Sequence, residues 1–439
     1  MPILRDLQPR IRRALGHVAV RNALLLYGVQ ISSYVFPIIT ISFLSRVLSP
    51  EKIGLIGLAT SFVWYFNTLT EYGFNLTATR RIAIQKESPD AVSQIFNAVM
   101  TAKALLTMTG FVALTGLVAA IPQYRANWQL YFLSFLTVVG NWLFPMWLYQ
   151  GVEKMGQVAA RDFIAKLLGT ALVLLVVRRE SDYLYAAGIQ AGATVIAGGI
   201  SLALAPAICG VRFRLVPWRD VWEVLREGWP VFLSMAAMTL TSNTNVVILG
   251  FVTTKTEIAY YTNSYRLIVA VRMLVSPMVT ALYPHISHMA SKSTTNAVTF
   301  LRKYALVMAS PFLLISLITF AAAPFIVHKF FGTKFDYSPT ILLLRIMAFS
   351  PFLLALSHSY STYYMLAFGY QKKWSQIVLQ STALNYVLLA CLLWAIRPIN
   401  ALATVGIALD VFSLSASYYF YWSNTHKKEA EAGLPVSGV

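Results

Sequence analysis

Acidic residues are scarce in this chain of 439 residues, where 17 aspartates and glutamates stand against 35 lysines and arginines. Cysteine occurs only as Cys209 and Cys391, one near the end of a predicted membrane span and one inside another, so we expect no disulfide between them. The sequence has no Cys/His cluster with metal-ligand spacing and no glycine-rich phosphate loop that ends in lysine. We therefore predict no metal site, no cofactor and no ATP hydrolysis by this chain.

Hydrophobic residues make up 57% of the chain and charged residues 12%, which is typical of a polytopic membrane protein. A helix needs roughly 20 apolar residues to cross the hydrocarbon layer. On this criterion we predict an all-α fold with about twelve transmembrane helices, at 18–44, 53–77, 93–120, 127–149, 160–178, 183–207, 229–252, 257–285, 301–328, 337–368, 374–396 and 398–422. Basic residues lead directly into the first span, so we expect no cleaved signal.

The first predicted span carries a stripe of small, polar and aromatic residues on about a third of its circumference. The stripe consists of Ala23, Tyr27, Gln30, Ser33, Tyr34, Pro37 and Thr40. Unpaired polar groups are costly in hydrocarbon, so this face should contact protein or a wet cavity. Helix packing through small residues and the lining of a cavity both explain it.

The basic residues are distributed unevenly between the two sides of the membrane. Twenty of the 35 fall in the tails and the even-numbered loops, and nine fall in the odd-numbered loops, which predicts cytoplasmic N and C termini. Membrane orientation explains the positive charge more simply than nucleic-acid binding. We predict an N-terminal lobe at 1–209, a cytoplasmic linker with an amphipathic helix at 210–228, and a C-terminal lobe with its tail at 229–439. Weak repeats suggest that the two six-helix lobes are pseudo-symmetric around a central lumen.

Ionisable residues inside spans are expensive and often functional. The basic ones outnumber the acidic ones and predict an electropositive cavity; they are Arg21, Lys103, Lys166, Arg266, Arg272 and Arg345, against Glu71, Asp162 and Asp410. Asp162 and Lys166 have the spacing of a helical ion pair. Asp410 and His358 are candidates for carrying a coupling ion or for structural roles, and Glu71 for a structural role or coupling.

Two stretches carry a family resemblance. FLSRVLSPEKIGLIGLA followed by EYGFNLTATRRIA, and NTNVVILGFVTTKTEIAYYTNSYRLI followed by SPMVTALYPHISHM, resemble the Wzx-type O-antigen flippases of the multidrug/oligosaccharidyl-lipid/polysaccharide (MOP) flippase superfamily. The resemblance implies a non-enzymatic bacterial inner-membrane protein that moves an undecaprenyl-diphosphate-linked oligosaccharide to the periplasmic leaflet by alternating access. It also implies contact with polysaccharide polymerase machinery. Many relatives carry Asp where this chain has Asn243 and Asn245, which weakens any coupling scheme built on that span.

On this basis the six basic residues are predicted to bind the diphosphate, because lysine and especially the planar guanidinium of arginine suit phosphate. Amide and aromatic side chains are predicted to contact the glycan, namely Tyr27, Gln30, Tyr34, Asn67, Trp142, Asn243 and Asn245. Glu71, Asp410 and His358 are coupling candidates for H⁺ or Na⁺. A cation-coupled multidrug or metabolite antiporter, a lipid II flippase and a non-transporting assembly or polymerase subunit stay as alternatives, although the short loops argue against the last.

Overall fold

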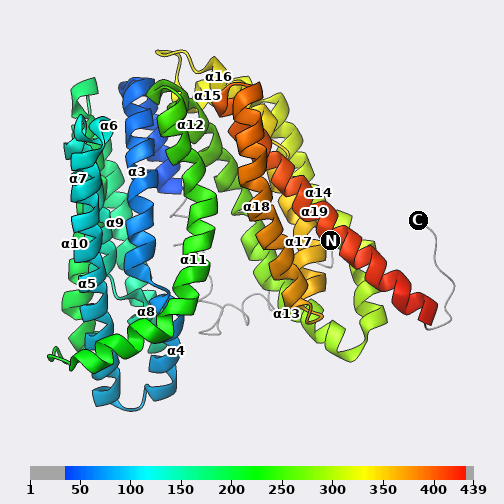
Figure 1. Cartoon of the computed structure of the whole chain (residues 1–439), viewed down its shortest axis with the longest axis horizontal. Helices are drawn as coiled ribbons and strands as arrows, with labels where there is room; N and C mark the ends of the chain where they lie inside the picture. The colour runs from blue at the N-terminus through cyan, green and yellow to red at the C-terminus, as the bar shows by residue number, and fades with distance from the viewer. Residues whose placement is uncertain (1–34, 432–439) are drawn as a thin grey trace, which may run out of the picture. The chain divides into compact units, whose positions relative to one another are not determined.

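The computed structural model describes residues 35–431, without the side chains of 157–159, 241–242, 280–281 and 427–431. Arg21, Tyr27, Gln30 and Tyr34 therefore lie outside the described residues. The chain divides into two compact units, Met1–Val247 and Ile248–Val439. Regular structure in the described part is helical throughout, as predicted (Figure 1).

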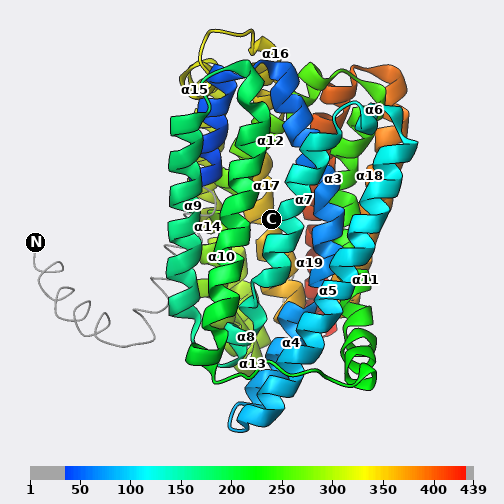
Figure 2. The same ribbon diagram turned by 90° about the vertical axis from the view of Figure 1, so that its left-hand side faces the viewer.

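In unit 1, long helices alternate with short ones at breaks in the spans. Residues 35–47 are helical and precede a series of further helices. These are α3 (Pro50–Glu71), α4 (Phe74–Gln85), α5 (Pro89–Ala120), α6 (Pro122–Arg125), α7 (Trp128–Leu143), α8 (Met146–Gly151), α9 (Met155–Val176), the 3₁₀ turn η1 (Glu180–Asp182), α10 (Tyr183–Cys209) and α11 (Trp218–Val252), whose last residues belong to unit 2. Figure 2 views unit 1 with α5, α7, α9 and α10 running alongside one another.

In unit 2, too, long helices alternate with short ones. Its elements are α12 (Lys255–Arg272), α13 (Val275–Lys292), α14 (Thr294–Ala321), α15 (Ala323–Phe331), α16 (Ser338–Met347), α17 (Ser350–Tyr360), the π-helical turn η2 (Ser361–Leu366), α18 (Gln371–Ala395) and α19 (Pro398–Glu431). The predicted span 337–368 thus consists of α16, α17 and η2, and 257–285 of α12 and part of α13.

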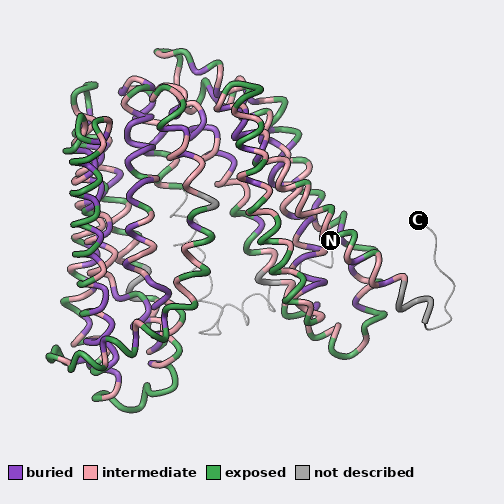
Figure 3. Tube along the Cα trace, in the orientation of Figure 1, coloured by how far each residue is buried: buried purple, intermediate pink, exposed green. Residues whose placement is uncertain are grey.

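Eight helical segments among the described residues are long and apolar enough to cross a membrane, and ten if two bent pairs each count as one span. The predicted count of twelve is therefore not confirmed. Most of the first predicted span lies in residues 1–34, outside the described part. The fifth predicted span, 160–178, coincides largely with α9. Many of the exposed positions on such helices (Figure 3) are large apolar residues, as expected for surfaces that face lipid.

The break between α3 and α4 results from the local backbone conformation and packs against α11. Tyr72 and Gly73 both adopt left-handed backbone conformations, with φ of 48° and 82°, which end α3. The Tyr72 ring stacks on Phe232 of α11 with centroids 4.7 Å apart. Gly228 of α11 lies so close to Tyr72 that a Cβ there would meet the ring at 2.9 Å. The break is therefore held by close packing against α11.

Helices α7 and α10 approach each other through glycines. A Cβ on Gly140 would lie 2.7 Å from the Thr194 backbone, and one on Gly198 would collide with the Gly140 carbonyl oxygen. Small residues of this kind let two membrane helices pack backbone to backbone. The adjacent Gly199 has open space around it, so only one of the two neighbouring glycines serves the contact.

The predicted amphipathic segment is helical and forms the start of α11. Val221 and Val224 are buried in the core of unit 1, whereas Trp218 and Trp222 are 63% and 60% exposed. The two compact units divide at Val247, inside α11. The lobe boundaries predicted at 209 and 229 stay a prediction.

Candidate functional site

Unit 1 contains a buried ion pair between two of the predicted residues. Lys103 of α5 is fully buried, and its Nζ lies 3.0 Å from Glu71 Oε1 at the end of α3. The Glu71 side chain is 23% exposed and accepts a second bond from Asn75 Nδ2 at 2.8 Å. A buried ammonium needs such compensation, because an unpaired charge in a low-dielectric interior is very costly.

The second partner of Lys103 is a backbone carbonyl that lacks its usual hydrogen bond within the helix. Lys103 Nζ donates to Asn141 O at 2.9 Å. In a continuous helix this carbonyl would accept from the N–H of residue 145, but residue 145 is proline and has no N–H. Pro145 ends α7, and the lysine supplies the donor that the proline removes.

Two predicted glycan residues lie beside this pair. Asn67 is buried, and its Oδ1 accepts from Asn141 Nδ2 at 2.7 Å. Trp142 is partly buried and donates from Nε1 to the Met100 carbonyl at 3.2 Å. Through Asn141, one hydrogen-bonded cluster of unit 1 therefore joins Lys103, Glu71 and Asn67, which were predicted for the diphosphate, ion coupling and the glycan.

Unit 2 contains a second, more accessible ion pair. Arg272 at the end of α12 lies 2.9 Å from Asp410 Oδ2 on α19, and the two side chains are 28% and 13% exposed. Ser350 Oγ, at the start of α17, donates to Asp410 Oδ2 at 2.5 Å and receives a bond from the same arginine nitrogen. The bonds to Asp410 and Ser350 are all made by Nη1 of the arginine. The Nε and Nη2 edge of the guanidinium, which suits bidentate phosphate binding, is not used by either partner.

His358 lies further along α17. Its Nδ1 is 2.8 Å from Thr362 Oγ1, one turn later on the same chain segment. This contact gives the imidazole a local hydrogen-bond partner. Its predicted coupling role stays a prediction.

The other predicted residues are not gathered at either pair. Lys166 is bonded to Asp162 at 2.5 Å, which confirms the ion pair predicted from their spacing. Arg345 is exposed, donates to the Phe320 carbonyl and lies over the Phe320 ring. Partly buried positions are held by Arg266 on α12 and by Asn243 and Asn245 on α11.

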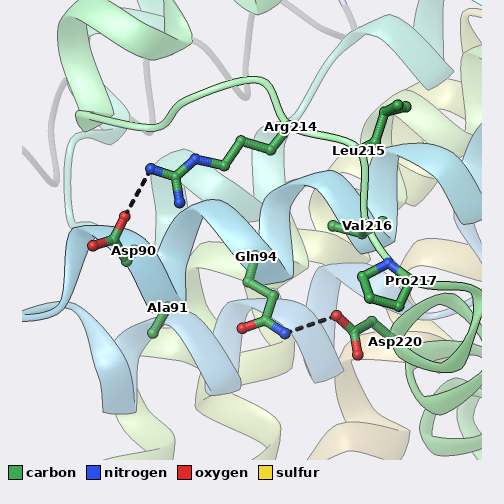
Figure 4. Close-up of a pocket in the computed structure, with 8 residues that line it drawn as sticks. All are labelled: Asp90, Ala91, Gln94, Arg214, Leu215, Val216, Pro217 and Asp220. Atoms are coloured by element: carbon green, nitrogen blue, oxygen red, sulfur yellow. Dashed lines mark hydrogen bonds and ion pairs between the residues drawn. The ribbon is translucent and has the colours of Figure 1, made fainter.

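The linker before α11 is fixed to the start of α5. The backbone N–H of Arg212 donates to Ser93 Oγ, and Asn97 bonds to the backbone of Arg212 and Arg214. Beyond these contacts, a pocket is lined by Asp90, Gln94, Arg214 and Asp220 with neighbouring residues (Figure 4). Both carboxylates are occupied there: Asp90 pairs with Arg214 at 3.1 Å, and Gln94 donates to Asp220 at 2.7 Å. The pocket anchors the linker and offers no free charge pair.

Sequence reasoning missed Asn75, Asn141 and Ser350. For Asn141 a signal exists, because a proline four residues later always frees the carbonyl of the earlier residue. Ser350 and Asn75 are common residue types whose positions carry no such signal.

The comparisons with known proteins agree with this architecture. Residues 19–290 match the family model described as "Polysaccharide biosynthesis protein". A protein of Escherichia coli (strain K12) named "Putative O-antigen transporter" is 31% identical over 88% of this chain and 92% of its own length. A protein of Shigella dysenteriae with the same name is 30% identical over 61% of this chain and 67% of its own length.

Solved structures show the same fold at low sequence identity. The lipid II flippase MurJ in an inward closed conformation has a TM-score of 0.70 at 13% identity, covering 90% of this chain and 87% of its own. An inward-facing multidrug resistance transporter of the MATE family in the MOP superfamily has a TM-score of 0.68 at 13% identity, covering 92% and 96%. With its family-model match over more than half of its length and a 31% identical relative along most of it, this chain belongs to the polysaccharide biosynthesis protein family.

Proposed function

We propose that this protein is a flippase that moves undecaprenyl-diphosphate-linked oligosaccharide, an O-antigen or exopolysaccharide repeat unit, from the cytoplasmic to the periplasmic leaflet of a bacterial inner membrane by alternating access. The observation that carries the proposal is the 31% identity with a protein named an O-antigen transporter along almost the whole of both chains. Both curated relatives are named as transporters, which supports transport rather than enzymatic chemistry. Cytoplasmic termini and contact with polymerase machinery belong to the same proposal.

Arg272 is the best supported contact for the diphosphate. Its side chain is partly accessible, and one edge of its guanidinium is free of Asp410 and Ser350. A diphosphate would bind this edge through two parallel hydrogen bonds. Asp410 then serves as the counter-ion that keeps the arginine in place before substrate arrives.

Among the proposed diphosphate residues, Lys103 is much less accessible than Arg272. It has no exposed surface, and two of its three donors are used by Glu71 and Asn141. It could bind substrate only after this cluster opens, whereas Arg272 needs no such step. Arg21, Lys166, Arg266 and Arg345 remain further candidates, and Asn67, Trp142, Asn243 and Asn245, with Tyr27, Gln30 and Tyr34, remain candidates for the glycan.

A cation-coupled antiporter is the second candidate, since a transporter of multidrug resistance shares the fold. Such a transporter would need acidic groups for organic cations. In this chain six basic residues and three acidic ones were found in the predicted spans, which favours an anionic ligand.

The test is movement of a fluorescent polyprenyl-diphosphate oligosaccharide across the bilayer of proteoliposomes, with protein-free liposomes as the control. Arg272→Ala should abolish protein-dependent movement, and Arg272→Lys should keep part of it, because lysine retains the charge but loses the bidentate fork. Arg219→Ala is the matched arginine control, since its side chain is exposed and it is not among the residues proposed for the diphosphate. Absence of movement by folded wild-type protein, with several glycans tried, contradicts the proposal, and drug-driven proton exchange would then test the antiporter.

A further inference from the structure

A line of hydroxyl and amide groups follows one face of α19 away from the Arg272–Asp410 pair. The positions are i, i+3, i+7, i+11 and i+14, which fall within about a quarter of the helix circumference at 100° per residue. They are Asp410, Ser413, Ser417, Tyr421 and Asn424. Such a face is unexpected on a membrane helix unless it lies against protein or water.

The helix that packs against this face carries a matching series. Along α17 and η2 the positions i, i+7, i+11 and i+14 are Ser350, Ser357, Ser361 and Tyr364. The two series meet at three levels: Ser350 Oγ bonds to Asp410, Ser357 Oγ lies 3.3 Å from Ser413 Oγ, and Tyr364 OH accepts from Asn424 Nδ2 at 2.8 Å. We call these two facing series the hydroxyl seam; it lies wholly within unit 2.

Two groups in the middle of the seam lack the bonds that their burial demands. Ser417 is 1% exposed and Tyr421 is 5% exposed, yet neither hydroxyl has a hydrogen-bond partner among the described residues. Other hydroxyls of the seam bond locally, as when Ser361 Oγ donates to the Ser357 carbonyl. A buried hydroxyl without a partner costs about 1–3 kcal/mol. Local helix bonding therefore explains Ser361 but not Ser417 and Tyr421.

The spacing of the seam suits single water molecules. At 1.5 Å per residue, Ser413, Ser417 and Tyr421 follow one another at roughly 6 Å along the helix axis. Two hydrogen bonds through one water span about this distance, and buried water commonly satisfies groups of this kind. Each hydroxyl both donates and accepts, so a chain of hydroxyls and waters can pass a proton along its length.

The ends of the seam are a carboxylate and a more accessible tyrosine. Asn424 Nδ2 also donates to Tyr370 OH at 2.8 Å, and Tyr370 is the partly buried residue that precedes α18. The amide nitrogen holds the hydroxyls of Tyr364 and Tyr370 in place but does not relay the proton, which passes between these two hydroxyls through water. Lys372 and Lys373 follow it, and the charge distribution assigns this end to the cytoplasm. The other end is Asp410, which is 13% exposed.

We propose that the hydroxyl seam conducts protons between the Tyr370 end of unit 2 and Asp410, and that protonation of Asp410 releases Arg272 for the substrate diphosphate. The second half of this statement rests on the proposed function. The proton adds to a carboxylate oxygen of Asp410 and cancels its charge, while Arg272 keeps its own. The arginine then has no charged partner within the pair and binds an incoming anion more strongly.

Other charged and titratable groups surround Asp410 on the elements packed against α19. Arg272 is bonded to it, and Tyr265 of α12 lies within electrostatic range of both. His358 of α17 lies within range of Arg272. The remaining packed elements bring Tyr363 and Tyr364 on η2, Arg345 on α16, and Tyr386 on α18. A carboxyl signal must therefore be assigned by replacing Asp410 itself.

The test follows the protonation of Asp410 in purified full-length protein after a rapid drop in pH. Infrared absorption of the protonated carboxyl group reports the reaction, and the part of the signal absent in Asp410→Asn belongs to Asp410. Ser417→Ala and Tyr421→Phe each remove one oxygen from the seam. We expect each to slow the Asp410 signal by about 100-fold or more, the scale of a lost proton-transfer group.

The same helix provides matched controls. Ser415→Ala and Tyr419→Phe make identical chemical changes at exposed positions, and they should leave the rate unchanged. Because these buried hydroxyls bond to no protein group, Ser417→Ala and Tyr421→Phe should unfold at about the same temperature as wild type. A slower signal in a protein of undiminished stability separates proton conduction from a packing defect.

Equal rates in wild type, Ser417→Ala and Tyr421→Phe would overturn the proposal, as would the absence of any Asp410 signal between alkaline and acidic pH. The measurement uses no substrate. Its failure therefore leaves the flippase proposal standing, and failure of the liposome assay leaves the seam to be judged by the infrared rates alone.

Discussion

Replacing one partner of the Lys103–Glu71 pair should destabilise unit 1, and replacing both should cost no more than replacing the lysine alone. Lys103→Met leaves Glu71, which keeps 23% exposure and its bond from Asn75, and it orphans the Asn141 carbonyl. We expect a cost of about 3 kcal/mol, at the lower end for a broken buried pair. Glu71→Met leaves the fully buried ammonium with only a carbonyl partner, so about 4 kcal/mol is expected.

In Lys103→Met/Glu71→Met neither charge remains, and the chief loss is the unpaired Asn141 carbonyl and Asn75 amide. The double variant should therefore be about as stable as Lys103→Met alone, near 3 kcal/mol below wild type rather than the additive sum of about 7 kcal/mol. Unfolding by SDS titration from detergent micelles, followed by circular dichroism, measures all four proteins.

Lys86 and Glu153 provide the matched control, since they form the same type of pair at 3.2 Å with side chains 42% and 74% exposed. Their replacements should cost less than about 1 kcal/mol and be nearly additive. Additivity within about 0.5 kcal/mol at Lys103 and Glu71 would refute the reasoning. The double variant also tests the role of the pair: if it is folded and still flips substrate, Lys103 and Glu71 are structural, and if it is folded but inactive, the pair takes part in transport.

Three further predictions concern backbone contacts and the arginine. Gly198→Ala should destabilise the protein by about 2 kcal/mol because its Cβ would collide with the Gly140 carbonyl, whereas Gly199→Ala, with open space, should be neutral or stabilising in thermal unfolding. Pro145→Ala supplies the N–H that Asn141 O lacks, so Lys103→Met should cost about 1 kcal/mol less in that background, measured by the same SDS titration. In liposomes, Asp410→Asn should flip substrate without responding to a pH gradient, because Arg272 is then permanently free of a charged partner; a response equal to that of wild type would contradict this.

Much of the helical framework could be predicted from the sequence because long apolar runs have few alternatives in a bilayer. The predicted spans 93–120 and 183–207 match α5 and α10 within a few residues. The Asp162–Lys166 pair could also be predicted, since a spacing of four places both side chains on one helix face.

The partners across helices could not be predicted in this way. Lys103 and Glu71 lie on different helices, and Arg272 and Asp410 are separated by most of unit 2 in sequence, so only the fold decides that they meet. The spacing of the hydroxyl residues on α19 can be recognised as one continuous face only once α17 is known to lie against it. Without that neighbour, serines at these positions resemble the small residues of any packed membrane helix.

The bond from Lys103 to the carbonyl freed by Pro145 links two distant sequence positions. A lysine is tolerable at 103 because a proline stands at 145, and the proline is tolerable because the lysine satisfies the carbonyl it exposes. Neither position should change alone during evolution. Among relatives of this protein, a residue with a backbone N–H at the equivalent of 145 should therefore accompany loss of the lysine at the equivalent of 103, so the contact should be visible as covariation between the two columns of an alignment.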